Sequence, residues 1–103
     1  MPPSRTTTNY SLDEVTALIE CYDLLRVAAE RSPTWLVRRC DVDRAVRSLP
    51  PKEYQAVLLI GLIGLDTRTV GEALDVSFMT AWRRYQRGLE YTVNYLNTGG
   101  HGR

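Results

Sequence analysis

The stretch from Thr67 to Arg87 constrains the fold of this 103-residue chain more than any other. It reads as two helices separated by a tight turn at Asp75. Thr67 is predicted to cap the first helix, because its hydroxyl can accept hydrogen bonds from the unpaired amides of the first turn. Ser77 is predicted to cap the second helix in the same way. Asp75 supplies the turn residue that must tolerate a left-handed backbone.

The predicted second helix extends from Ser77 to about Leu96 and has two unlike faces. Small and apolar residues recur at helical spacing along the inward face, as at Ala81 and Tyr85. The opposite face is aromatic, sulfur-bearing and basic, which is not the composition of a core face. It comprises Phe78, Met79, Trp82, Arg83, Gln86 and Arg87, with Arg84 at the flank. Gly71 and Ala81 are small where two helices crossing at a short turn must approach closely, so the pair has the layout of a helix-turn-helix.

The residues before this pair predict a buried helix. The sequence Leu-Pro-Pro at 49–51 breaks the chain, and its last proline is well placed in the first turn of a new helix. The run from Ala56 to Leu65 is almost wholly apolar and too short to span a bilayer. It is therefore expected to be the central buried helix of a small bundle, with Gly61 and Gly64 allowing a close approach or a helix end.

The segment from Asp41 to Leu96 resembles region 4 of bacterial sigma factors and the sigma-like regulators, several of them encoded by phages, that keep only this domain. The matching elements, in chain order, are Leu49-Pro50, Tyr54 to Leu65, Leu74 to Ala81, and Arg83, Arg84 and Arg87. Several of these elements agree in order and spacing at once. The resemblance implies an all-α fold, a small helical bundle with a C-terminal helix-turn-helix, a long recognition helix and a role in transcription.

The chain departs from the family on the face that reads DNA. Phe78, Met79 and Trp82 occupy positions that in the family often carry polar or charged base-reading residues. Phe78 and Trp82 are four residues apart on a helix, so they form an aromatic patch that water does not favour. This patch is expected to contact a DNA groove, to form a protein interface, or to pack under the N-terminal segment.

The resemblance also implies roles for individual residues. Arg83 is expected to bind a guanine edge, and its neighbours Phe78 and Met79 to touch thymine methyl groups. Arg84 and Arg87 are expected to bind phosphates, and so are the free amides that begin the preceding helix. The expected DNA-binding residues are Thr67, Arg68, Thr69, Ser77, Phe78, Met79, Thr80, Trp82, Arg83, Arg84 and Arg87.

The N-terminal part predicts two further helices. Ser11, with Glu14 three residues on, has the capping-box pattern and begins an amphipathic helix that extends to about Glu30. A second helix is expected from about Pro33 toward Val46. These helices either complete the bundle or provide a dimer seam. The residues expected at a protein interface are Leu12, Val15, Ile19 and Tyr22 on the first helix, and Phe78 and Trp82 on the recognition helix.

At 103 residues the chain is expected to form one domain, spanning residues 11–97. Residues 11–48 are expected to form the N-terminal helices and residues 49–97 the sigma region 4-like part. Residues 1–10 and 98–103 are expected to be a flexible arm and a flexible tail. A net charge of +1 is weak for a protein that binds DNA alone, so a homodimer or a larger complex is expected.

Catalytic and metal chemistry is not expected. Cys21 and Cys40 have no metal-binding or pairing motif and read as buried free thiols, and the single histidine is His101. No Gly-rich phosphate loop, nucleophile motif or carboxylate cluster occurs in the sequence, so neither an enzyme nor a cofactor is expected. No signal peptide or long apolar run occurs either, which favours a cytoplasmic protein that does not associate with membranes.

Three functional hypotheses follow. The first is a regulator of transcription that binds double-stranded DNA and acts as an activator, a repressor or an adaptor associated with RNA polymerase or a sigma factor. The second is a phage packaging protein similar to small terminase subunits, which also use helix-turn-helix domains. The third is a protein-binding module, in which the face at Phe78 and Trp82 docks on RNA polymerase or a sigma factor.

Overall fold

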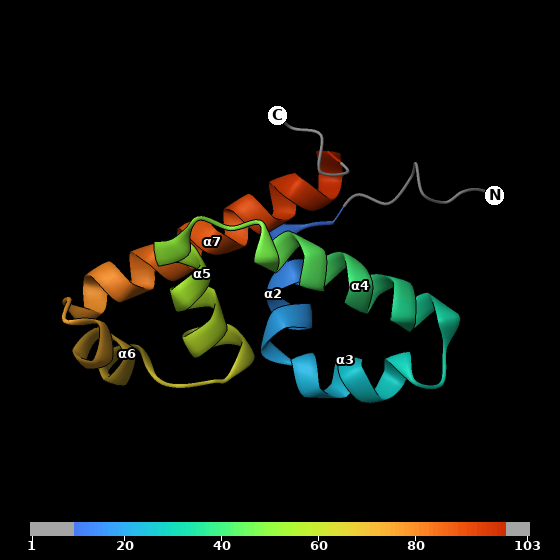
Figure 1. Cartoon of the computed structure of the whole chain (residues 1–103), viewed down its shortest axis with the longest axis horizontal. Coiled ribbons are helices and arrows are strands. Elements are labelled where there is room, and N and C mark those ends of the chain that lie inside the picture. Colours follow the sequence, from blue (N-terminus) through green and yellow to red (C-terminus); the bar gives the residue numbers. More distant parts are fainter. Residues whose placement is uncertain (1–9, 99–103) are drawn as a thin grey trace.

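The structure, a computed structural model, describes residues 10–98, and helices make up most of this backbone (Figure 1). The elements are α2 (Leu12–Glu20), α3 (Tyr22–Ala29), α4 (Pro33–Arg47), α5 (Pro51–Ala56), the π-helix η1 (Val57–Leu62), α6 (Thr67–Leu74) and α7 (Phe78–Thr98). No strand occurs between residues 10 and 98, and the predicted all-α fold is confirmed.

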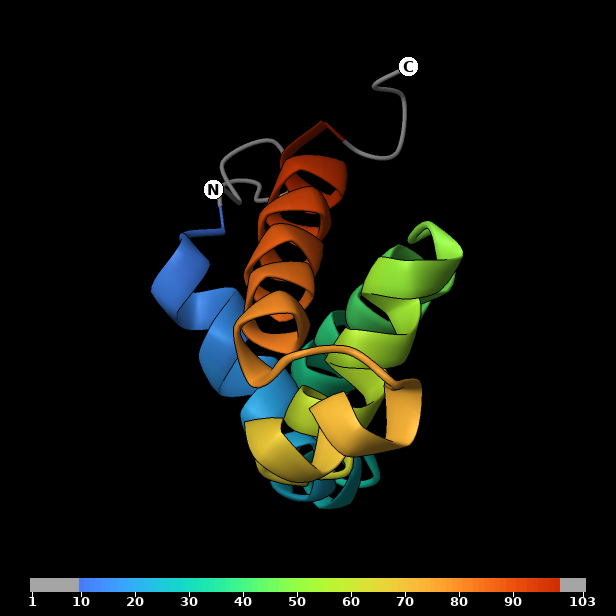
Figure 2. The ribbon, with the colours of Figure 1, turned by 90° about the vertical axis from the view of Figure 1, so that its left-hand side faces the viewer.

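The central helix of the bundle is α7, which packs against α2, α4, α5, η1 and α6. Figure 2 shows α7 between α2 on one side and the α4–α5 segment on the other. Tyr85, Leu89 and Thr92 of α7 are almost completely buried. The prediction that residues 56–65 form the central helix is therefore wrong. That run begins buried at Ala56 and Val57, but it reaches the surface by its end because the chain leaves the core there to enter α6.

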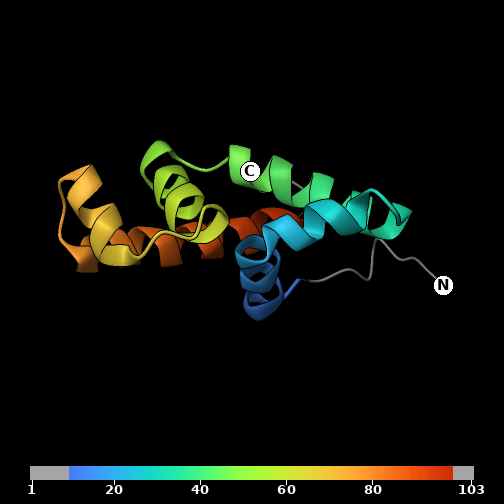
Figure 3. The same ribbon diagram turned by 90° about the horizontal axis from the view of Figure 1, so that it is seen from below.

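The predicted single helix from Ser11 to Glu30 is broken at Cys21, where φ is −109° and ψ is 34°. Its capping box is confirmed, because the Ser11 hydroxyl accepts from the Glu14 amide and the Glu14 carboxylate accepts from the Ser11 amide. The break sends α2 and α3 in clearly different directions (Figure 3). As a result α2 packs on α7 whereas α3 packs on α4.

Tyr10 belongs to the core and not to a flexible arm, so the predicted boundary is wrong at this residue. Its ring is buried, and its amide donates to Oδ1 of Asn97 over 2.6 Å. The Asn97 side-chain amide donates back to the Tyr10 carbonyl over 3.0 Å. At the other end, Thr98 is the last residue of α7 and not the first of a tail. The rest of the predicted arm and tail lies outside the described residues.

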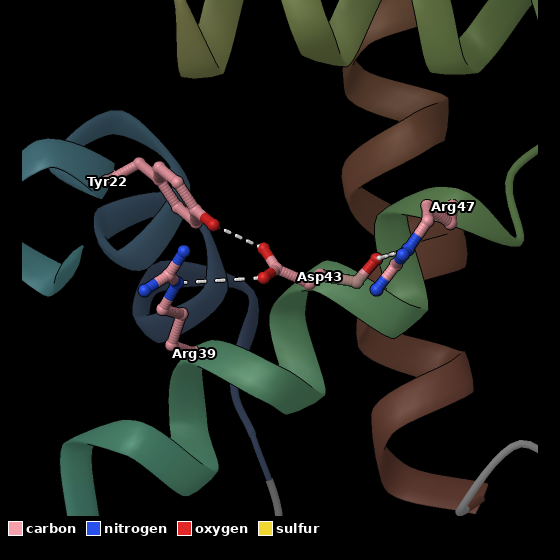
Figure 4. A network of polar contacts seen from close by, with 4 residues as sticks. All are labelled: Tyr22, Arg39, Asp43 and Arg47. Atoms are coloured by element: carbon pink, nitrogen blue, oxygen red, sulfur yellow. Dashed lines mark hydrogen bonds and ion pairs between the residues drawn. The ribbon is translucent and has the colours of Figure 1, made fainter. Parts of the chain in front are cut away.

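A polar network ties α3 to α4 (Figure 4). The Tyr22 hydroxyl donates to the Asp43 carboxylate, and the Arg39 guanidinium lies 3.7 Å from the same carboxylate. Arg47 Nε donates to the Asp43 backbone carbonyl over 3.3 Å. Partial burial and the bond to Asp43 raise the pKa of the Tyr22 hydroxyl. The network thus links α3 to α4, which lie beside the main core.

Two glycines let backbones approach closely. A Cβ on Gly61 would lie 2.5 Å from Ile19 Cγ2, which confirms the close approach predicted there. A Cβ on Gly88 would overlap Val57 Cγ2 and lie 3.3 Å from the Glu53 carbonyl oxygen. These contacts bring η1 against α2 and bring α5 and η1 against α7.

The two cysteines, Cys21 and Cys40, are exposed, so the prediction of buried thiols is wrong. Cys21 lies at the break between α2 and α3, and Cys40 lies on the outer side of α4. Helical spacing alone did not identify which side of α4 faces the core. None of the helices described between residues 10 and 98 is long and apolar enough to cross a membrane.

Substituting Gly88→Ala is expected to lower the free energy of unfolding by about 1–3 kcal/mol, as overpacking of a core does. The new methyl must displace either the stiff Val57 side chain or the α5 backbone at Glu53. This cost should exceed the gain of about 1 kcal/mol in helix propensity. Urea unfolding followed by circular dichroism measures the difference. A variant more stable than the wild type would contradict the close packing of α5 on α7.

Candidate nucleic-acid interface

The first helix of the predicted pair, α6, is capped by Asp66 and not by Thr67, which is the first helical residue. The Asp66 carboxylate accepts from the Thr69 amide over 2.8 Å and from the Thr69 hydroxyl over 3.1 Å. These hydrogen bonds, above all the one from the backbone amide, lower the pKa of the Asp66 carboxyl. The start of α6 thus holds a carboxylate, and the prediction of free amides for a phosphate is wrong for Thr69.

Residues 75–77 turn the chain from α6 into α7. Asp75 has φ 60° and ψ 44°, which confirms the predicted left-handed residue. The Val76 amide donates to the Gly71 carbonyl over 2.8 Å. A Cβ on Gly71 would lie 2.8 Å from the Val76 carbonyl oxygen, so the predicted close approach at Gly71 is confirmed. Ala81, its predicted partner across the crossing, is completely buried.

The start of α7 is fixed by two hydroxyl groups. The Thr80 amide donates to Ser77 Oγ over 3.0 Å, and the Ser77 hydroxyl donates to Thr80 Oγ1 over 3.0 Å. The predicted cap at Ser77 is therefore confirmed. Because the Ser77 and Thr80 side chains are engaged in this cap, the groups available to a ligand in the first turns of α7 belong to the neighbouring residues.

These neighbours form an exposed surface, here called the α7 face, which comprises Phe78, Met79, Trp82 and Arg83. Phe78, Met79 and Trp82 are 45%, 47% and 45% exposed. Phe78 and Trp82 therefore do not pack under the N-terminal helices described here. Of the three arrangements expected for this patch, contact with DNA and contact with a protein remain. The Arg68 guanidinium of α6 stacks over the Phe78 ring, 4.9 Å from its centroid. This cation–π contact places a positive charge from α6 at the edge of the α7 face.

The three arginines of α7 have different surroundings. Arg83 is exposed and forms no ion pair within residues 10–98. Arg84 is half-buried. Arg87 lies 3.9 Å from the Glu53 carboxylate of α5, which is nearly buried. Arg87 therefore has a structural partner, and Arg83 is the arginine whose charge is most available to a ligand.

Acidic residues reduce the positive charge around this surface. Glu72 near the end of α6 and Asp75 in the turn are both exposed. With Asp66 at the start of α6, they oppose the charges of Arg68 and Arg83. The surface is thus amphipathic rather than strongly basic.

Of the residues predicted at an N-terminal interface, Val15 and Ile19 are completely buried. Their prediction as interface residues is wrong, because α2 packs them into the core beside α7. Tyr22 is half-buried and bonds to Asp43, whereas Leu12 is exposed. The structure therefore offers no continuous dimer seam along α2.

Three features of the site were not predicted from the sequence. The Asp66 cap had a local signal, because aspartate ranks with serine above threonine as an N-cap and Asp66 precedes the helix. The Arg68–Phe78 contact had none, because it depends on how α6 crosses α7. The Glu53–Arg87 pair likewise joins residues far apart in the chain.

Replacing Asp75 tests the turn. Asp75→Gly is expected to raise the free energy of unfolding by up to about 1 kcal/mol, because glycine accepts φ 60° without a Cβ clash. Asp75→Val is expected to lower it by about 1 kcal/mol or more, since a branched side chain is strained there. Denaturant unfolding of the two variants beside the wild type gives both values. Equal stability of the glycine and valine variants would be inconsistent with a left-handed turn.

The α7 face offers a guanidinium, two aromatic rings and a thioether on one helix. Among residues 10–98 no group of His, Cys, Asp and Glu could hold a metal ion. Comparison of the chain with protein-family models, with curated proteins and with solved structures finds no match.

Proposed function

We propose that α6, the turn and α7 act as a helix-turn-helix, and that the protein is a DNA-binding regulator of transcription. The observation that carries the proposal is the α7 face, in which Phe78, Met79 and Arg83 are exposed in the first turns of a helix with a fixed start. In helix-turn-helix proteins these turns of the second helix contact base edges in the major groove.

Three side chains of the α7 face, and Arg68 beside it, have roles in this proposal. The Arg83 guanidinium would donate two hydrogen bonds to a guanine edge, a contact worth about 1–3 kcal/mol of discrimination. Phe78 and Met79 would lie against thymine methyl groups. Arg68, held over Phe78, would bind a phosphate at the edge of the groove.

Arg84 and Arg87 are expected to contribute differently to DNA binding, because their surroundings differ. Arg84, at the flank of the face, would bind a phosphate and so add affinity without reading sequence. Arg87 contributes less to DNA binding than the other two, because its ion pair with Glu53 competes with a phosphate. The sequence predicted the same phosphate-binding role for Arg84 and Arg87, whereas their surroundings favour this role for Arg84.

A regulator of this kind needs a second contact. With a net charge of +1 and acids beside the α7 face, a single copy should bind duplex DNA weakly at physiological salt. The protein would therefore act as a dimer or beside another DNA-bound protein. An activator, a repressor or an adaptor on RNA polymerase each fits this requirement.

A second function is favoured by the apolar part of the α7 face. Three large apolar side chains near half exposure lie together on one helix, and exposed apolar patches often mark protein interfaces. In this alternative Phe78, Met79 and Trp82 dock on RNA polymerase or a sigma factor, and DNA is not contacted.

Binding of fluorescent duplex DNA across a salt series tests the first function. Arg83→Ala is expected to weaken binding to a preferred sequence by about 1–3 kcal/mol. Arg84→Ala is expected to weaken binding to all sequences alike and to reduce the slope of log K against log salt by about one. Arg87→Ala should change binding less than Arg84→Ala does.

Arg47→Ala is the matched control, since Arg47 is exposed on α4, which packs on α7 but is not part of the α6–α7 pair or of the α7 face. It removes one positive charge, as the test variants do, and should leave DNA affinity nearly unchanged. If wild-type protein fails to bind at low salt, or if Arg47→Ala weakens binding as much as Arg83→Ala, the α7 face is not the DNA site.

Pull-down of purified RNA polymerase, with and without its principal sigma factor, tests the alternative. Protein docking predicts that Phe78→Ala combined with Trp82→Ala abolishes capture, because the apolar contact area is lost. Arg83→Ala should retain capture. If DNA binding alone is the function, the polymerase is not retained in the absence of DNA, and both variants behave as the wild type does.

A further inference from the structure

We infer that α3 forms the contact between two copies of this chain, paired antiparallel about a two-fold axis near Val27. The surface concerned, here called the α3 face, comprises Asp23, Leu24, Val27 and Arg31, all of them exposed. It lies on a different part of the molecule from α6 and the start of α7 (Figure 1). The inference does not depend on the proposed function, because self-association can be measured without DNA.

The spacing places these residues along one side of the helix. Asp23, Val27 and Arg31 follow one another at four-residue intervals, which brings their side chains into one stripe. Arg31 lies just beyond the end of α3, but Glu30 before it is still helical, with φ −71° and ψ −18°. Leu24 stands beside Val27 and one turn before it.

The apolar part of this stripe faces solvent. Leu24 is 70% exposed and Val27 is 53% exposed, whereas the opposite side of α3 is buried at Leu25 and Ala29. The α3 helix is thus apolar on both sides, although only one of them has a partner within residues 10–98. When a second surface covers apolar side chains exposed to this degree, their removal from water favours association.

The charges indicate which surface fits. Asp23 is acidic at the start of the stripe and Arg31 is basic at its end, and neither forms an ion pair within residues 10–98. In an antiparallel pair centred on Val27, Asp23 of each copy faces Arg31 of the other. A two-fold pair makes both contacts at once, since each surface meets itself. A parallel pair would place like charges together.

Glu30 does not cancel this pattern. Glu30 follows Val27 by three residues and Asp23 by seven, so it lies at the edge of the stripe, one turn after Arg26, which is also exposed. Arg26 and Glu30 are opposite in sign and four residues apart, so together they add no net charge, and the ends of the stripe keep Asp23 and Arg31 with apolar residues between them. This arrangement is complementary to itself when the helix direction is reversed.

A groove beside the stripe extends the available surface. It has a volume of about 390 Å³ and lies between α2, α3 and α4, with Leu18, Leu24, Ala28 and Trp35 among its lining residues. The helix α3 has only 8 residues, too few to bury the roughly 800 Å² per partner of a standard interface. The groove adds apolar surface beside the stripe but does not supply the remainder, so the dimer is expected to be weak and to form only at high protein concentration. The groove shares Leu24 with the stripe, so the two surfaces are continuous.

The contact would replace the seam predicted on α2, where Val15 and Ile19 are buried. It would leave the start of α7 uncovered in both copies. A dimer of this form carries two α7 faces and so doubles the available Arg83 side chains.

Sedimentation velocity over a wide range of protein concentration tests the inference. The wild type is expected to form a dimer as concentration rises. Val27→Glu and Leu24→Glu should raise the dimer dissociation constant at least about tenfold, because each buries a charge in the contact. Both positions are exposed in the single copy, and circular dichroism verifies that the variants remain folded.

Val37→Glu is the matched control. Val37 is a valine of similar exposure, 59%, on α4, and it does not line the groove. This variant should dimerise as the wild type does. A wild type that stays monomeric throughout, or a dimer disrupted by Val37→Glu and not by Val27→Glu, would overturn the inference.

Charge exchange tests the antiparallel direction. Asp23→Arg and Arg31→Asp should each weaken the dimer, and the double variant should restore it. In a Cys21→Ser, Cys40→Ser background, Val27→Cys should form a disulfide-linked dimer on mild oxidation, because the two copies meet at that residue. Failure of the double variant to restore the dimer, or absence of the cross-link in a protein that still dimerises, would contradict this geometry.

Discussion

The structure depends on the burial of one side of α7 along much of its length. Tyr85 and Leu89 fill the centre of the core, and Gly88 lets α5 and η1 approach the α7 backbone. The Tyr85 hydroxyl donates to Glu20 over 2.7 Å and so ties α2 to the same helix. Burial and this bond raise the pKa of the Tyr85 hydroxyl above its ordinary value. The first turns of α7 project beyond this packing, so one rigid helix provides both the core and the candidate site.

Local signals in the sequence were sufficient for the all-α class and for the turn. Ser77, Asp75 and Gly71 each meet a requirement that is set within a few residues of backbone, and all three predictions are confirmed. Predictions that depended on distant contacts were less accurate. The break at Cys21 and the burial of Tyr10 arise because α2, α4 and α7 meet in space, and helical periodicity carries no information about that meeting.

In the candidate site, too, local features were predicted from the sequence and contacts between distant residues were not. That Phe78 and Trp82 would face outward followed from their position opposite the apolar stripe, and both are exposed. The different surroundings of Arg83 and Arg87 could not be predicted, since the partner of Arg87 is Glu53 on another helix. The α7 face is amphipathic and the net charge of the chain is +1, so a single copy is expected to bind DNA weakly. This favours DNA binding together with a second copy or another protein. The α3 face lies apart from the start of α7, so two copies could meet there without covering the site (Figure 1).

Fluorescence of Trp82 tests the central claim, that the α7 face contacts DNA, most directly. The chain has two tryptophans, and a Trp35→Phe variant leaves Trp82 as the single indole, at the centre of the α7 face. Titration with duplex DNA at low salt is predicted to shift or quench the Trp82 emission, and added salt should reverse the change. DNA binding that leaves the Trp82 emission unchanged, or no binding by the folded variant and the wild type alike, would contradict the account.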